Sequence, residues 1–287
     1  MLGKGIWFAR LAVGLLLACS ALFFVQLWEW PAFSTHGIYK VWRYLEGVKA
    51  NVQTRNFSTM ETGHFVIKFI QKDKPYVQMV ADNAEEVYGP VTEFFGYYPG
   101  DKTVVVVYPD GESLAASFGW DRDEQAMGVY WAGTIRILSP GEWISTRDTE
   151  DVFKREGPMA HELTHLLVDN ITKGNYNRWF TEGVAQYVER RVTGFSFAEP
   201  SPDRQLRYYE FELLENDFDS LDQRLAYWQS LVAVECIVDK AGKEGLLQVM
   251  KALGDGCSFE EAIKKGTGMD FNQFAREVYF RLDHNLG

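Results

Sequence analysis

Cysteine is scarce in this sequence. The 287 residues include three cysteines, and no two of them form a Cys-x-x-Cys pair. A zinc site built from cysteine thiolates is therefore not expected. Cys19 lies in an apolar stretch, which leaves Cys236 and Cys257 as a pair that could form a disulfide outside the cell. The alternative is that Cys236 stays reduced on the buried face of a helix.

Blocks of basic residues are also missing, and the formal net charge is −11. Nucleic acids and anionic lipid surfaces attract proteins through clustered lysine and arginine, so neither is an expected partner. The chain has no internal repeat and no low-complexity linker. With 46% hydrophobic residues, it is long enough for one large domain or two small ones with a sizeable core.

The N-terminus carries a long apolar run from Leu11 to Leu27, in which only Ser20 and Gln26 are polar. Tryptophans bracket the run, and its length suits a bilayer. These features favour an uncleaved transmembrane helix within residues 1–30 over a cleaved signal segment. Basic residues before the run place the rest of the chain outside the cytoplasm, although further basic residues follow it. The prediction is a single-pass protein of the cell membrane.

Hydrophobic periodicity indicates the helices and strands of the chain after residue 30. Residues 31–58 are expected to form a stalk or first helix, and residues 59–287 one compact domain. In that domain, strands are expected at His64–Phe69, Thr103–Tyr108, Met127–Trp131 and Thr134–Leu138, with a helix at Pro75–Phe95. From about residue 149 the pattern is mostly helical, with helices expected near 158–169, 179–192, 204–215, 221–239, 242–253, 258–265 and 270–284. This order predicts an α+β fold, with a sheet-containing lobe followed by a helical lobe.

The strongest chemical signal is the run His161-Glu162-Leu163-Thr164-His165, which ends seventeen residues before Glu182. On a helix the two histidines lie only about 40° apart, and helical phase places them opposite an apolar face. Glu182 falls on the polar face of a second amphipathic helix, beside Gly183, which permits close helix approach. These residues predict a zinc ion bound by His161, His165 and Glu182, with a fourth position left for water. The alternative is a chance pair of surface histidines.

Glu162 is the predicted general base. It projects between the histidine face and the core, from where its carboxylate can reach a water on the metal without being a ligand. Zinc lowers the pKa of such a water, and Glu162 would take its proton and pass it to the leaving amine. The reaction also needs a donor that stabilises the oxyanion.

Two segments together resemble the gluzincin, or thermolysin-like, zinc metallopeptidases. They are the HELTH run and the segment Arg178–Tyr187, whose sequence is RWFTEGVAQY. The likeness is closest to the bacterial peptidase MA-like group and covers about residues 60–284. It implies a zincin-like fold, the same three zinc ligands, the same general base, and a peptide or protein substrate. It also implies that Thr134–Leu138 is the edge strand that pairs with the substrate backbone.

The sequence departs from thermolysin at one position. There an aspartate four residues after the ligand glutamate orients a histidine, whereas this chain has Gln186. Asp169 and Glu189 are open alternatives for that role. The group also has a tyrosine in the helix after the second motif, which makes Tyr227 the favoured oxyanion donor. Alternative donors are Tyr208, Tyr209 and Tyr187.

Together these features predict a membrane-anchored zinc metallopeptidase with an extracytoplasmic catalytic domain. The competing hypothesis, motivated by Gln186 and by the open choice of oxyanion donor, is a catalytically degenerate zinc-binding domain. That domain would act as an interaction protein at the cell surface. A chain that binds no metal is a third alternative.

Overall fold

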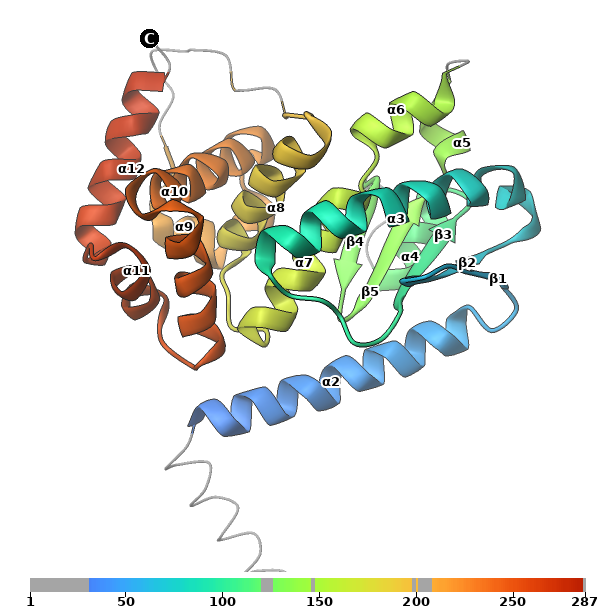
Figure 1. Cartoon of the computed structure of the whole chain (residues 1–287), viewed down its shortest axis with the longest axis horizontal. Helices are drawn as coiled ribbons and strands as arrows, with labels where there is room; N and C mark the ends of the chain where they lie inside the picture. The colour runs from blue at the N-terminus through green and yellow to red at the C-terminus, as the bar shows by residue number, and fades with distance from the viewer. Residues whose placement is uncertain (1–30, 120–125, 146–147, 198–199, 201–207, 286–287) are drawn as a thin grey trace, which may run out of the picture. The chain divides into compact units, whose positions relative to one another are not determined.

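The computed structural model describes residues 31–285 apart from 120–125, 146–147, 198–199 and 201–207 (Figure 1). Contacts divide the chain into residues 1–42 and residues 43–287. Helix α2 (Pro31–Gln53) opens the described part and confirms the predicted first helix. All elements from β1 onward, and the whole candidate site, belong to the second unit.

The structure contradicts the predicted single-pass protein of the cell membrane with an extracytoplasmic catalytic domain. Across the described residues, no helix combines the length and the apolar character needed to cross a bilayer. The apolar run from Leu11 to Leu27, on which the prediction rested, lies outside the described residues.

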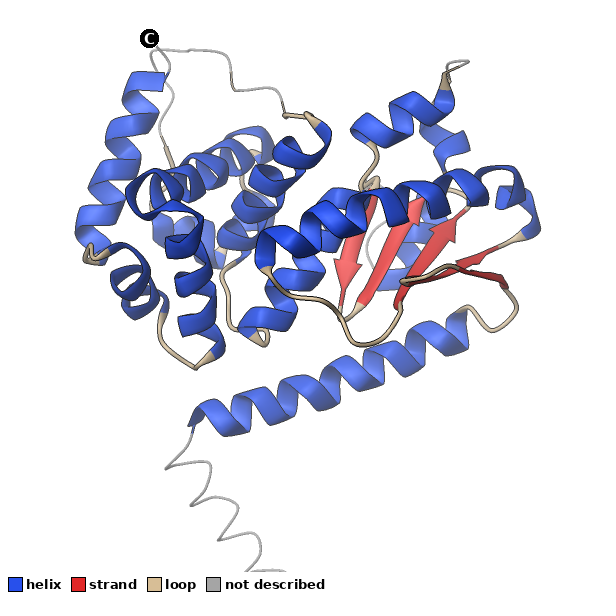
Figure 2. Cartoon of the chain, viewed as in Figure 1, coloured by secondary structure: helices blue, strands red, loops and turns tan. Residues whose placement is uncertain are grey.

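A five-stranded sheet with the order β1-β2-β3-β5-β4 forms the first lobe (Figure 2). The three central strands β2, β3 and β5 are parallel, and β1 and β4 run antiparallel at the two edges. The four predicted strands are confirmed, and β1, which is short and mostly exposed, is a fifth that hydrophobic alternation does not reveal. The strand bounds are β1 Ser58–Glu61, β2 Phe65–Phe69, β3 Thr103–Tyr108, β4 Gly128–Trp131 and β5 Thr134–Leu138.

The prediction that Thr134–Leu138 is the edge strand is wrong. That segment is β5, which pairs with β3 on one side and with β4 on the other. The reason is the two-residue turn at Ala132 and Gly133, whose φ angles are 47° and 92°. Two positive φ angles suit a tight hairpin, which folds β4 back along the outer side of β5. The edge strand on this side of the sheet is therefore β4 (Gly128–Trp131).

Helices cover both faces of the sheet. Helix α3 (Lys74–Phe95) crosses one face of the sheet (Figure 2). On that face, alternate strand residues such as Val105 and Val107 join the main core. Helix α4 (Gly111–Phe118) lies on the opposite face, over the small cluster of Val106, Tyr108 and Leu114. Because successive strand residues point to opposite faces, the valine run of β3 serves both cores.

The second lobe is mostly helical, as predicted, so the chain has the expected α+β architecture. Ser258 and Glu261 form the reciprocal hydrogen bonds of a capping box at the start of α11. Helix α10 changes direction at Gly242, whose φ is 71°, close to the predicted break after residue 239. The helix bounds are α5 Pro140–Trp143, α6 Thr149–Glu156, α7 Met159–Thr172, α8 Arg178–Thr193, α9 Phe211–Asn216, α10 Gln223–Gly254, α11 Phe259–Thr267 and α12 Phe271–Asn285, with single 3-10 turns at Gln71–Asp73 and Phe218–Ser220.

The possible disulfide is absent, because Cys236 and Cys257 are both free. Cys236 is buried in α10, as the alternative interpretation expected, and burial raises the pKa of its thiol to about 11. This thiol is a packed core residue rather than a reactive one.

Candidate metal centre

Helix α7 carries the first motif and is buried on all sides. Its apolar face, which includes Leu163 and Leu167, packs into the core. Its opposite face lies against α8, which leaves His161 only 8% and His165 only 6% exposed. The alternative of a chance surface pair of histidines is therefore wrong, since both imidazoles are enclosed and need polar partners.

The structure brings the three predicted ligands together. The Nε2 atoms of His161 and His165 lie 3.2 Å and 3.5 Å from Oε2 of Glu182. One potential ligand atom from each of the three residues lies within 4.8 Å of the other two. Two imidazole nitrogens and one carboxylate oxygen converging on a common point form a donor set that suits a divalent metal ion such as zinc.

Each histidine is also held through its other ring nitrogen. Nδ1 of His161 lies 3.0 Å from Oε2 of Glu189, and Nδ1 of His165 lies 2.6 Å from Oγ1 of Thr181. A hydrogen bond at Nδ1 orients the ring and leaves Nε2 free to bind a metal. The question that the sequence left open is thus answered for His161, whose carboxylate partner is Glu189.

Asp169 has a different role. Its carboxylate lies 2.9 Å from Nη1 of Arg43 and accepts a 2.5 Å hydrogen bond from the hydroxyl of Tyr130. That hydroxyl in turn accepts a hydrogen bond from the backbone N–H of Gly133. Asp169 therefore ties the end of α7 to the β4–β5 hairpin and to Arg43.

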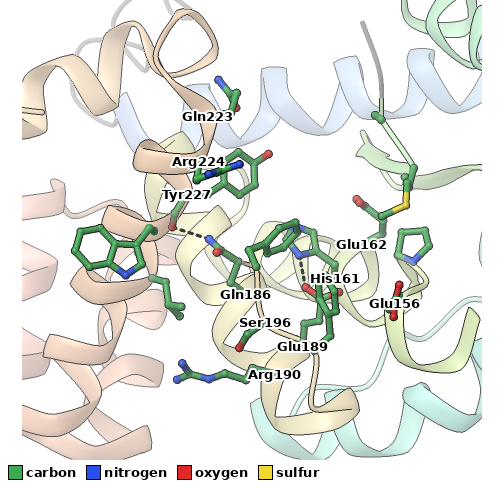
Figure 3. A pocket seen from close by; sticks show the side chains of 18 residues that line it. Glu156, His161, Glu162, Gln186, Glu189, Arg190, Ser196, Gln223, Arg224 and Tyr227 are labelled. Carbon is green, nitrogen blue, oxygen red and sulfur yellow. Dashed lines mark hydrogen bonds and ion pairs between the residues drawn. The ribbon is translucent and has the colours of Figure 1, made fainter. Parts of the chain in front are cut away.

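Gln186, at the position that departs from thermolysin, links two helices. Its Nε2 donates to the backbone oxygen of Tyr227 at 2.8 Å (Figure 3). It also donates to the backbone oxygen of Glu182, at 3.2 Å. The side chain thus fastens α8 to α10. It does not contact either histidine among its described hydrogen bonds, so the aspartate's orienting role does not pass to this position.

Gly183 has the predicted role of permitting close helix approach. A Cβ at this position would lie 2.2 Å from the backbone oxygen of Ser230 on α10. Only glycine allows α8 and α10 to pack at this distance. The packing sets the position of the neighbouring Glu182 against α7.

Glu162 is buried, with 5% of its surface exposed, and it lies against the edge strand. A Cβ on Gly128 would come within 3.0 Å of Oε1 of Glu162, so glycine makes room for this carboxyl. Burial raises the pKa of Glu162, while the two neighbouring histidines and a backbone hydrogen bond with Tyr130 act in the opposite direction. An enclosed carboxyl with a raised pKa, fixed by a strand backbone, has the properties of a proton carrier.

Charge is concentrated among the three candidate ligand residues. Burial disfavours the charged form of Glu182, but Arg178 and the two histidines outweigh burial and hold the pKa of this carboxyl well below its usual value. For His161, burial is likewise outweighed by Glu189 and Glu182, so the pKa of the imidazole is raised well above its usual value. A metal cation would take the place of the proton that these anions attract.

A cavity of about 560 Å³ opens beside these residues and is lined by His161 and Glu162 (Figure 3). Met127 and Gly128 contribute to it from the edge-strand side. Further lining residues are Phe195, Phe197, Tyr227 and Trp228. The cavity is large enough for an amino-acid side chain or a short peptide segment.

Tyr227 lies where the sequence predicted, in the helix after the second motif. It is partly buried and lines the same cavity as Glu162. Burial raises the pKa of its phenol, and the negative charges of Glu182 and Glu162 act in the same direction. Among the alternatives, the hydroxyl of Tyr208 donates to Leu282, and the hydroxyl of Tyr209 accepts from the backbone of Asp222.

Sequence reasoning did not assign roles to Thr181 and Arg178, although both lie inside the second motif. Arg178 is four residues before Glu182, and their side chains meet at 2.5 Å. Thr181 lies beside Glu182 and faces the other helix. Helical spacing alone could have indicated the first contact, because residues four apart share a helix face. The second depends on how α8 crosses α7.

Comparison with known proteins identifies relatives of this chain. A sequence model of the Peptidase MA superfamily matches residues 129–279, which is more than half of the chain and includes both motifs. The chain is also similar to the uncharacterized protein YhcO of Bacillus subtilis (strain 168). The two are 18% identical over 235 residues, which cover 76% of this chain and 70% of that protein.

Proposed function

Because the chain belongs to the Peptidase MA superfamily, we propose that it is a zinc-dependent metallopeptidase of the gluzincin type. The observation that carries the proposal is the convergence of His161, His165 and Glu182 beside a buried glutamate and an open cavity. Residues 59–287 would form the peptidase domain. The substrate would be a peptide or a protein.

The metal would be held by Nε2 of His161, Nε2 of His165 and Oε2 of Glu182. Two imidazoles and one carboxylate are the set that zinc hydrolases use, and they leave a position open for catalysis. When bound there, zinc would polarise the scissile carbonyl and lower the pKa of a water molecule. The contacts of Glu189 and Thr181 with the histidines support this assignment, since such contacts orient metal ligands.

Glu162 would act as the general base. Its carboxylate would accept the proton of the attacking water and then deliver it to the leaving amine. The close approach of Gly128 and the backbone hydrogen bond with Tyr130 hold the carboxyl in place for both transfers.

Tyr227 would stabilise the negative charge that develops on the carbonyl oxygen, by donating a hydrogen bond from its hydroxyl. Its place on the cavity wall supports this role. The outer side of the edge strand β4 would align the substrate, because an extended peptide can add to an edge strand through backbone hydrogen bonds. Gly128, which lines the cavity, lies at the start of that strand.

The test is the substitution Glu162→Gln, which removes the base but keeps nearly the same shape. We expect hydrolysis of a peptide library to fall by about 10²- to 10⁴-fold while zinc remains bound at one ion per chain. Chelation should abolish wild-type activity, and added zinc should restore it. Glu93→Gln, at an exposed site on α3, is the matched control and should behave as wild type. Full activity of Glu162→Gln would refute the assigned mechanism.

The competing hypothesis of a degenerate zinc-binding domain was motivated by Gln186. The contact of Glu189 with His161 weakens that motive, because a carboxylate partner for the histidine is present at another position. The same assay separates the two functions. Wild-type protein that binds zinc and cleaves no peptide in the library would favour the interaction protein.

A further inference from the structure

The two carboxylate oxygens of Glu182 have different partners. Oε2 faces Nε2 of both His161 and His165, at 3.2 Å and 3.5 Å. Oε1 lies 2.5 Å from Nη1 of Arg178, one helical turn earlier on α8. The glutamate therefore turns one oxygen toward the histidines and has the other bound to a guanidinium.

Helix stability does not account for an arginine at position 178. Arg178 is the first residue of α8, and a cation at a helix N-terminus is opposed by the helix dipole. The first turn contains no acidic residue, and Asn177 makes no capping hydrogen bond with its side chain. The contacts of its guanidinium therefore explain better why an arginine occupies this position.

Those contacts hold the guanidinium from a second element. Nε of Arg178 lies 3.4 Å from Oδ1 of Asp219, and its charged group lies 5.8 Å from the ring of Phe218. Both residues belong to the 3-10 turn Phe218–Ser220. Arg178 is thus supported on one side while it binds Glu182 on the other.

The difference in burial between Glu182 and Arg178 makes their contact important for the metal site. The side chain of Glu182 is only 2% exposed, whereas that of Arg178 is 42% exposed, so the guanidinium lies between Oε1 and the solvent. Without Arg178, that oxygen would lose its charged partner and would either take water in its place or turn toward the metal. A carboxylate can bind a metal through one oxygen or through both, and a second oxygen held by an arginine is withheld from the metal.

We propose that Arg178 is a positioning residue that restricts Glu182 to coordination through Oε2 alone. This restriction keeps a coordination position of the metal free for water and substrate. The inference rests on the proposed function. It concerns which oxygen of Glu182 binds the metal, so it can be measured separately from peptide hydrolysis.

The experiment compares three variants of the full chain. Arg178→Met removes the charge and the hydrogen bonds but keeps an unbranched side chain, Arg178→Lys keeps the charge, and Arg191→Met changes an exposed arginine elsewhere on α8. For each, we would measure the zinc dissociation constant by competition with a chelating dye. We would also record the visible spectrum of the cobalt(II)-substituted protein and measure kcat and KM for peptide hydrolysis.

For Arg178→Met we expect zinc affinity that does not fall, weaker cobalt absorption, and a kcat lower by about 10- to 100-fold with a smaller change in KM. Weaker absorption reports a coordination number above four, because tetrahedral cobalt(II) absorbs more strongly than five- or six-coordinate cobalt(II). Arg178→Lys should recover part of the wild-type spectrum, and Arg191→Met all of it. If Arg178→Met does not fold, Asp219→Asn removes only the outer support, and we expect the same spectral change to a smaller extent.

A cobalt spectrum and a kcat equal to those of wild type would overturn the inference, whatever the loss of thermal stability. The proposed function fails in a distinguishable way. In that case the wild-type protein itself would bind neither zinc nor cobalt, or would bind them without cleaving any peptide.

Discussion

Replacing Gly183 with alanine tests whether α8 packs on α10 as closely as the structure indicates. A Cβ at this position would lie 2.2 Å from the backbone oxygen of Ser230 and 2.7 Å from Cγ2 of Val234. Separations below 3.0 Å are essentially never seen for real Cβ atoms, so the two helices must move apart by on the order of 1 Å. Because one contact is with helix backbone, a change of rotamer cannot relieve it.

The magnitude follows from two opposing effects. Overpacking of this kind costs about 1–3 kcal/mol, and the rigid backbone contact favours the upper part of that range. Alanine returns up to about 1 kcal/mol through its higher helix propensity. The expected net loss is about 1–2 kcal/mol in the free energy of unfolding. For a domain of this size, that loss lowers Tm by about 2–8 °C.

Differential scanning calorimetry of metal-free protein measures this shift. The matched control is Gly47→Ala, also within a helix, where a Cβ would meet nothing within 4 Å. There the same substitution should raise stability by up to about 1 kcal/mol, because only the propensity term remains. If Gly183→Ala raised Tm as Gly47→Ala does, the argument from helix packing would be refuted.

Two further predictions concern charge. Glu189→Gln removes the anion beside Nδ1 of His161, so we expect zinc affinity to fall about 10- to 100-fold in a chelator competition, and an unchanged affinity would contradict this role for Glu189. For Glu85, burial acts to raise the pKa, but hydrogen bonds with Thr62 and His64 outweigh burial and lower the pKa below 4.5. The resulting stabilisation is present above that value and is lost as the pH falls through the folded-state pKa. The Tm deficit of Glu85→Gln should therefore be larger at pH 7 than at pH 3, and a deficit independent of pH would count against this assignment.

The local elements of the site were predictable from the sequence. Hydrophobic periodicity defines α7 and α8 because each helix buries a stripe of residues spaced by its own turn. The four-residue spacing of His161 and His165 then places both imidazoles on one face, whatever the helix packs against. The spacing to Glu182 matches a known motif, and the structure brings the three side chains together as that motif implies.

Other expectations failed because they depended on partners distant in the sequence. The periodicity of β5 is the same for an inner strand and for an edge strand, and only its pairing with both β3 and β4 decides between them. The same limit applies to Cys236 and Cys257, whose presence in one chain says nothing of their separation. The predicted single-pass membrane protein is contradicted for a different reason, because no helix of the described residues is long and apolar enough to cross a bilayer, and the apolar run from Leu11 to Leu27 lies outside them.

The sequence by itself determined which chemical groups make up the candidate site, namely two imidazoles and two glutamate carboxyls. Only the tertiary structure decided what holds these groups, namely Glu189 behind His161, Thr181 behind His165 and Arg178 on Glu182. Residue type and helical phase are local properties, which a linear pattern records. The contacts that hold the candidate ligands depend on the angles and distances at which the helices pack. Those angles and distances follow from the packing of the whole core.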